Sequence, residues 1–330
     1  MLNALFLLAA LAAPQEKVFD DWAVACDNVK RCEATALQAP EQFGDEPAQV
    51  LISREPGPAG ALAISIDPGE GKRGAITLLI DGKPVVEGVV TDNYRISGAP
   101  AEQLARRMAA GHWLELRQGG KVAARVSLAG ISAMLRHVDA TQGRAGTVTA
   151  IVATGTAAAV TVPVAASLPV VPALRTARGA PESPSKAVLG ELARLGDCDL
   201  SLVSGDLPVE RYRLDAKATL VLLPCGSGAY NFNTAAFVLR GGAGVPAEFD
   251  VPPDWIEGDG PAILTNSGFS TVDGAMLTSS AKGRGLGDCG TSQSWVWDGS
   301  RFRLIEARTL GECRGSVSWL TVFRAMPAWR

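Results

Sequence analysis

The chain has 330 residues, of which 47% are hydrophobic and 20% are charged. A chain of this length is longer than a domain with a single hydrophobic core usually is, so it allows two domains. Its 36 glycines and 20 prolines favour a turn-rich protein over a helix bundle. The 31 basic and 34 acidic residues give a formal net charge of −3, so we expect no nucleic-acid partner.

The first segment, residues 1–13, contains an uncharged apolar run from Ala4 to Ala13. Such a run is too short to span a bilayer as a helix, which needs about 20 residues, but it is typical of the apolar region of a signal peptide. Ala10 and Ala12 form an A-x-A cleavage pattern. We therefore expect cleavage near Ala12, a periplasmic or secreted protein, and no transmembrane segment in the mature chain.

Residues 18–154 predict a β-rich, sandwich-like domain with two packed helices. Apolar and polar residues alternate at 61–67, 75–81 and 113–118, as in half-buried strands. Short hairpin turns are expected at Asp81-Gly82 and Gly119-Gly120. Amphipathic helices are expected between Pro100 and Gly111 and between Leu128 and Gly143, and 147–153 is predicted as a last strand.

Residues 155–187 predict an Ala/Pro-rich linker. No charged residue occurs from Ala145 to Leu174, but this stretch has too little Leu, Ile and Phe for a membrane span. A short helix over 185–196 leads into a second domain, residues 188–330, whose alternating segments predict an antiparallel β-meander. Overall, we expect a mainly β protein of the α+β kind.

Six cysteines form an even set, which in an exported protein predicts disulfides. Several connectivities are open, and proximity in the sequence favours Cys26–Cys32, Cys198–Cys225 and Cys289–Cys313. The chain has no C-x-x-C pair and only two histidines, His112 and His137, so we expect neither a metal site nor a cofactor. We assign both histidines structural or surface roles.

The glycine-rich stretch 282–290 is the first candidate for a functional loop. Its spacing fits neither a dinucleotide-binding nor a phosphate-loop motif, and strands rather than a helix follow it. One interpretation is a bulged turn beside a disulfide. The other is a ligand-binding loop in which Lys282 and Arg284 present charge to an anion.

The tryptophans of the second domain allow two interpretations. Trp295, Trp297 and Trp319 lie in alternating strands close to arginines, which suits either a small core or a contact surface. We place the binding surface in this domain because polar residues there lie beside flexible glycines and disulfides. The candidate residues are Lys282, Arg284, Asp288, Asn231, Arg314, Trp295 and Trp319.

Several sequence blocks carry a family resemblance: FDDWAVACDNVKRCEA (19–34), LAGISAMLRHVDATQGRAGTVTA (128–150), LLPCGSGAYNFN (222–233), KGRGLGDCG (282–290), WVWDG (295–299) and ECRGS (312–316). Together they resemble an exported bacterial family known as domain-of-unknown-function family 1176. The W-x-V-x-C-D opening at Trp22 is also similar to the invasion-associated locus B family. The resemblance implies export from Gram-negative cells and a β-rich, two-part chain, and it implies no reaction or catalytic residue.

These observations lead to two functional hypotheses. The first is a non-enzymatic periplasmic binding or interaction protein of the cell envelope, whose partner is an envelope protein or a small anionic ligand. The alternative is an envelope hydrolase or an enzyme inhibitor that acts through the glycine-rich loop with Arg284, Asp288 and Arg314. An inhibitor would expose these side chains on a loop, whereas a hydrolase would hold them in a cleft beside a base.

Overall fold

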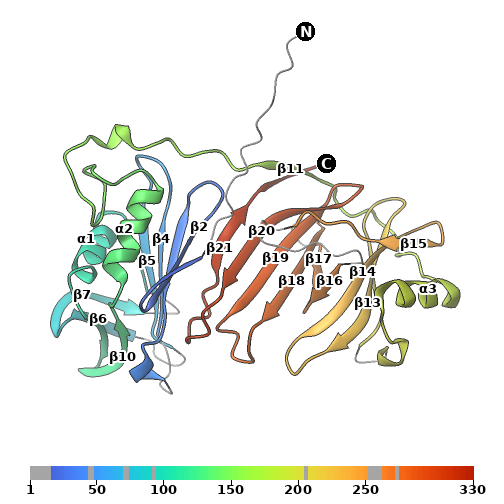
Figure 1. Ribbon diagram of the computed structural model, residues 1–330, viewed down its shortest axis with the longest axis horizontal. Helices are drawn as coiled ribbons and strands as arrows, with labels where there is room; N and C mark the ends of the chain where they lie inside the picture. The colour runs from blue at the N-terminus through green and yellow to red at the C-terminus, as the bar shows by residue number, and fades with distance from the viewer. Residues whose placement is uncertain are drawn as a thin grey trace, which may run out of the picture.

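The computed structural model describes residues 16–43, 48–69, 74–90, 94–203, 207–251, 262–271 and 275–330. The predicted signal peptide, residues 1–13 with cleavage near Ala12, lies outside the described residues. Strands dominate the described part, which contains three α-helices and several antiparallel sheets (Figure 1). The prediction of a mainly β fold is confirmed.

The N-terminal half consists of two antiparallel sheets that share one hydrophobic core with helices α1 (Ala99–Met108) and α2 (Ile131–Thr141). The six-stranded sheet has the order β1 (Lys17–Phe19), β2 (Trp22–Cys26), β3 (Cys32–Ala36), β4 (Gln49–Arg54), β5 (Leu62–Asp67) and β8 (Tyr94–Ser97). The four-stranded sheet has the order β10 (Lys121–Ser127), β9 (Trp113–Gln118), β6 (Gly74–Ile80) and β7 (Lys83–Val90).

Both predicted helices are present and amphipathic. In α2, Ile131, Met134, Leu135 and Val138 are buried at helical spacing, as the sequence pattern indicates. Gly130 precedes α2 with φ +83°, and a Cβ atom there would lie 1.9 Å from the carbonyl oxygen of the last residue of β1. Only glycine therefore allows this helix to begin so close to the sheet.

The predicted strand over 147–153 is wrong. This segment forms turns, which the buried carboxylate of Asp139 holds in place. Asp139 accepts hydrogen bonds of 2.9–3.0 Å from the backbone N–H groups of Ile151, Val152 and Ala153. A side chain thus replaces the strand partner that the alternating sequence suggests.

Residues 155–187, predicted as a linker, cross from the N-terminal half to the C-terminal half (Figure 1). Their middle is not merely extended, because β11 (Val170–Ala173) pairs in parallel with β22 (Met326–Trp329). Where one domain ends and the next begins, at 18–154, 155–187 and 188–330, stays a prediction.

The C-terminal half contains two further antiparallel sheets that enclose a common core. One has the order β12 (Glu210–Arg213), β13 (Thr219–Ser227), β14 (Phe232–Arg240) and β15 (Ala243–Pro246), with β16 (Ile263–Thr265) also paired to β14. The other has the order β17 (Gly268–Ser270), β18 (Met276–Lys282), β19 (Gly290–Trp297), β20 (Phe302–Leu310) and β21 (Leu320–Arg324). The predicted helix is α3 (Lys186–Gly196), which packs on the outer face of β13 and β14.

Strand β2 joins the two halves, because it is buried on both faces. Trp22 and Val24 face the N-terminal core, whereas Ala23 and Ala25 belong to the C-terminal core. Strand β21 lies beside β2 (Figure 1), and the small alanine side chains permit this close approach. The halves are therefore packed against each other along a buried face.

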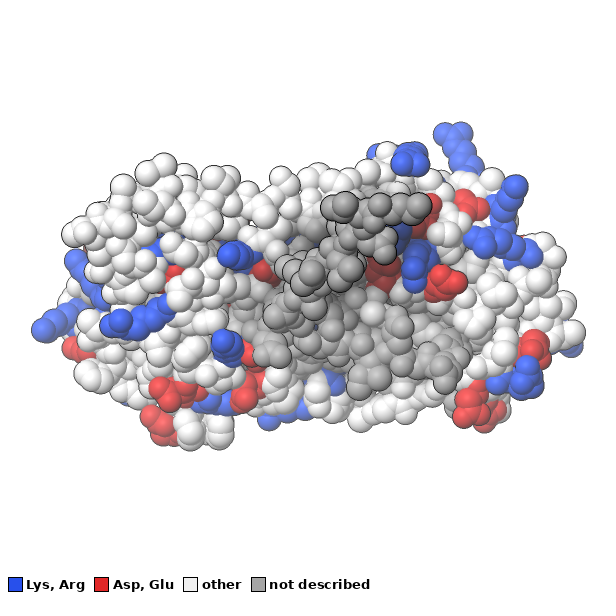
Figure 2. All heavy atoms as spheres, turned by 45° about the horizontal axis from the view of Figure 1, so that its top comes forward, with Lys and Arg blue, Asp and Glu red and all other residues white. Residues whose placement is uncertain are grey.

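The three disulfides are Cys26–Cys32, Cys198–Cys225 and Cys289–Cys313, with Cα–Cα distances of 3.9, 4.6 and 4.7 Å. These are the pairings that sequence proximity favours. Within the described part of the chain, no helix has the length and apolar character needed to cross a membrane. On the face shown in Figure 2, basic and acidic side chains of the described residues are interspersed.

Candidate binding surface

Three loops meet at one end of the C-terminal half. They are the β13–β14 loop, the β16–β17 turn and the glycine-rich β18–β19 loop. The Tyr230 hydroxyl donates to the carbonyl of Gly283 at 3.0 Å, and its ring lies 3.6 Å from where a Cβ atom would stand at Gly285. Residues distant in the sequence therefore form one continuous surface, which we call the loop surface.

Asn231, a predicted site residue, fastens these loops together. Its amide donates to the carbonyl of Lys282 at 2.9 Å, and its Oδ1 accepts from the Lys282 N–H at 3.1 Å. Asn266, which has φ +42°, donates to Asn231 Oδ1 at 3.0 Å. The side chain of Asn231 is thus engaged in structure, while the side chain of Lys282 is exposed.

The glycine-rich stretch is the tight connection between β18 and β19, next to the Cys289–Cys313 bridge. Inside it, Arg284 forms a bidentate ion pair with Asp288, whose side chain is buried and also accepts from the Gly315 N–H at 2.7 Å. The hydrogen bond and charge of Arg284 hold the pKa of Asp288 below its ordinary value. The loop is therefore held by its own side chains.

Leu286 lies in this held loop with 73% of its surface exposed. The loop closes tightly because Gly290 has φ +147° and a Cβ atom there would lie 2.1 Å from the carbonyl oxygen of Ala281. Arg284 is 46% exposed despite its ion pair. The loop surface thus presents one apolar side chain beside two cationic ones, Lys282 and Arg284.

The two tryptophans predicted as site residues have structural contacts, and Trp319 is the one that reaches the glycine-rich loop. Trp295 is buried in the C-terminal core and donates from Nε1 to the carbonyl of Asp250 at 2.8 Å. Trp319 is half-buried and donates from Nε1 to the carbonyl of Gly287 at 3.0 Å. The geometry therefore accounts for both side chains through packing and loop support.

Arg314 lies between two residues that contact the glycine-rich loop, but its side chain reaches into the N-terminal half. Its guanidinium donates to the carbonyl of Gln38 at 2.6 and 3.0 Å and to the carbonyl of Asp20 at 2.8 Å, and it forms an ion pair with Asp21. Beside it, the hydroxyls of Thr35 and Ser316 are 2.6 Å apart. Arg314 is thus a contact between the halves.

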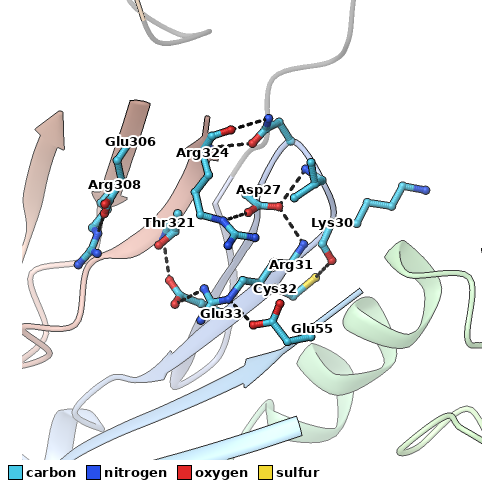
Figure 3. A network of polar contacts seen from close by, with 12 residues as sticks. Asp27, Lys30, Arg31, Cys32, Glu33, Glu55, Glu306, Arg308, Thr321 and Arg324 are labelled. Atoms are coloured by element: carbon cyan, nitrogen blue, oxygen red, sulfur yellow. Dashed lines mark hydrogen bonds and ion pairs between the residues drawn. The ribbon is translucent and has the colours of Figure 1, made fainter. Parts of the chain in front are cut away.

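A second polar network continues this contact between the halves (Figure 3). Asp27 accepts from Nε of Arg324 at 2.5 Å, and Glu33 accepts from the backbone N–H of Thr321 at 2.9 Å. Burial alone would raise the pKa of Glu33, but the ion pair with Arg31 and the hydrogen bonds hold it below its ordinary value. The carboxylates of Asp27, which follows β2, and of Glu33, in β3, therefore both accept hydrogen bonds from β21.

Sequence reasoning missed a cavity of about 190 Å³ next to the loop surface. It lies at the ends of β12, β13 and β14, beside the β16–β17 turn. Its side-chain donors and acceptors come from residues spread over more than fifty positions: Glu210, Ser227, Asn233, Thr234, Asn266 and Ser267. The one sequence signal is the polar start of β14, where Asn233 and Thr234 interrupt an apolar strand.

The two histidines, His112 and His137, lie in the N-terminal half. His112 is exposed, with Nδ1 3.3 Å from the carboxylate of Asp81. Burial and the charge of Lys17 lower the pKa of His137, which lies beside the ring of Phe19. Among the described residues, no three His, Cys, Asp or Glu side chains are grouped so that they could hold a metal ion.

Comparisons place this chain among known sequences. The family described as "Protein of unknown function (DUF1176)" matches residues 16–326. The uncharacterized protein YpfG of Escherichia coli K12 is 29% identical over 344 aligned positions, which cover 94% of this chain and 93% of that protein. The crystal structure of invasion associated protein B from Bartonella henselae matches 39% of this chain and 99% of its own, with 16% identity and a TM-score of 0.30.

Proposed function

Because the chain belongs to the DUF1176 family, described as proteins of unknown function, we propose its role from the loop surface. The proposed role is that of an exported, non-enzymatic binding protein of the cell envelope that holds a partner protein at this surface. The observation that carries the proposal is Leu286, an exposed leucine in a loop held by Asp288 and the Cys289–Cys313 bridge.

A held loop is suited to binding for an entropic reason. Ordering a loop on binding costs free energy, so a loop that is already fixed loses less when it docks. Leu286 supplies apolar area, and Lys282 and Arg284 supply positive charge beside it. The matching partner is a protein with an apolar pocket bordered by carboxylates.

Binding is favoured over hydrolysis by the state of Asp288. Its carboxylate is buried and engaged by Arg284 and by the Gly315 N–H, so it offers a substrate little access. Both histidines lie in the other half of the chain, away from this carboxylate. An exposed, cross-linked loop also suits an inhibitor of an envelope enzyme, which is the second candidate.

Export is supported by the disulfides. All six cysteines of the sequence are paired, and such bridges persist in oxidising compartments. The periplasm or the medium is accordingly the proposed location, with a signal peptide removed near Ala12.

The proposal is tested with a double variant, Leu286→Ala with Lys282→Ala, in a tagged full-length chain. The matched control is Val160→Ala with Lys121→Ala, since both of these side chains are exposed and lie outside the loop surface. In pull-downs from envelope extract, the wild type and the control should retain the same partner, and the double variant should lose it. If the double variant still retained the partner, the proposal that the loop surface binds it would be refuted.

The inhibitor candidate has its own measurement. Purified chain is added to the captured partner, and any enzymatic activity of that partner is followed with increasing amounts of chain. A stoichiometric loss of activity that Leu286→Ala abolishes supports inhibition. Unchanged activity at saturation leaves binding alone as the function.

A further inference from the structure

The cavity beside β12, β13 and β14 lies where the regular pairing of these strands is interrupted. The ladder between β12 and β13 ends where Glu210 pairs with Leu222. Strand β13 then continues, but its pairing with β14 shifts between Pro224 and Ser227 at a bulge. Gly226 at this bulge has φ +113°, so the backbone turns aside and leaves the hollow open.

The polar groups of the cavity keep free hydrogen-bonding capacity. Glu210 accepts from the Tyr212 hydroxyl at 2.6 Å through one carboxylate oxygen, and within the described part of the chain its other oxygen has no hydrogen-bond partner. Asn233 accepts from the Thr265 hydroxyl at 3.1 Å, while its amide nitrogen has no partner among the described residues. A ligand there meets an acceptor and a donor already in place.

A third polar element and an apolar wall complete the cavity. The hydroxyls of Thr234 and Ser267 are 2.9 Å apart, and each oxygen can still accept a further hydrogen bond. The ring of Phe232 is 48% exposed where it lines the cavity. One wall is thus aromatic and the others bear hydroxyl, amide and carboxylate groups.

From this combination we infer that the cavity binds a single sugar ring of a glycan. A pyranose has hydroxyls around its edge that donate to a carboxylate and accept from an amide, and it has an apolar C–H face that packs on an aromatic ring. The cavity volume of about 190 Å³ suits one ring rather than a larger ligand. This inference does not depend on the proposed loop surface.

The test uses saturation-transfer NMR on the full-length mature chain with the methyl α-glycosides of glucose, galactose and mannose and with N-acetylglucosamine. Ethanolamine is included, because a carboxylate such as Glu210 would also attract a simple ammonium ion. At least one sugar should receive saturation at its ring protons, with a Kd on the order of 1 mM for a ligand of this size. Ethanolamine should not compete with it.

Two variants locate the binding. Phe232→Ala should abolish the transfer, and Asn233→Ala should weaken the affinity about tenfold through loss of one hydrogen bond. The matched control is Phe43→Ala, which removes another exposed ring from the N-terminal half and should bind as wild type does. Thermal melting of each variant establishes that it is folded.

Three results would overturn the inference. These are no transfer to any of the four sugars at 50-fold excess over the expected Kd, displacement of the bound sugar by ethanolamine, and unchanged transfer in folded Phe232→Ala and Asn233→Ala. None of these results bears on the proposed role of the loop surface, since that role is tested by partner capture.

Discussion

Arg314, at the contact between the halves, provides the sharpest test of whether a predicted site residue stabilises the fold or binds a partner. The substitution Arg314→Ala removes a guanidinium that donates to two backbone carbonyls and pairs with Asp21. Asp21 is buried, so it would keep a charge with no opposite partner. Leaving a buried charge unpaired costs several kcal/mol in measured cases.

Arg314 is 19% exposed at its side chain, so solvent screens the pair only in part. Arg314→Ala breaks a partly buried ion pair and leaves two carbonyls without their donor, and we expect these losses together to lower the free energy of unfolding by about 3 kcal/mol. For a chain of this size we expect the melting midpoint to fall by about 6 °C.

The assay is thermal unfolding followed by circular dichroism and calorimetry at neutral pH. The matched control is Arg194→Ala, which breaks a well-exposed ion pair with Glu191 on α3 and should move the midpoint by less than about 1 °C. Arg314→Lys should recover part of the loss, since lysine keeps the charge but not the forked donors. If Arg314→Ala melted at the wild-type midpoint, the contact between the halves would be unimportant, and Arg314 would return as a binding residue.

Three further predictions concern stability. The pKa of Glu33 lies below its ordinary value, so the ionised carboxylate stabilises the fold at neutral pH, and this stabilisation is lost as the pH falls through the lowered pKa. In urea titrations, the loss of unfolding free energy caused by Glu33→Gln should therefore be largest near neutral pH and shrink below about pH 4. A loss that does not change with pH would contradict this. Replacing Cys289 and Cys313 together by Ala removes a disulfide of sequence separation 24 and should lower the free energy of unfolding by about 3.5 kcal/mol in denaturant titrations. An unchanged midpoint would mean that this disulfide does not stabilise the fold. Gly130→Ala should lower the free energy of unfolding by at least about 2 kcal/mol, because the new Cβ atom meets a carbonyl oxygen. Gly146→Ala, at a glycine that also has positive φ but open space around it, should lower it by less. Equal losses would show that the backbone conformation, and not the contact with the carbonyl oxygen, accounts for the effect.

Local pattern predicted much of the fold. Helical spacing located α1, α2 and α3, and paired turn residues such as Asp81-Gly82 located the hairpins. These features depend on neighbours within a few residues, which a single sequence displays. The segment 147–153 failed because its hydrogen bonds go to Asp139, a side-chain partner that alternation does not reveal.

The candidate site was harder because its parts depend on distant contacts. Arg314 looks the same in sequence whether it faces solvent or, as here, the carbonyls of Asp20 and Gln38 nearly three hundred positions away. The cavity likewise forms only after Glu210 and Asn233 have been brought together by the sheet. By contrast, the glycine-rich loop was found from sequence because its spacing is local.

The central claim, that the loop surface holds a partner, is tested most directly by cross-linking at one position. Leu286 is replaced by the photoreactive residue p-benzoylphenylalanine in the exported chain, and Val160 is replaced in the same way as an exposed control. After irradiation of intact cells, we predict one specific adduct from position 286, reduced by Lys282→Ala and by high salt and absent from position 160. The same adducts from both positions, or none from position 286, would contradict the claim.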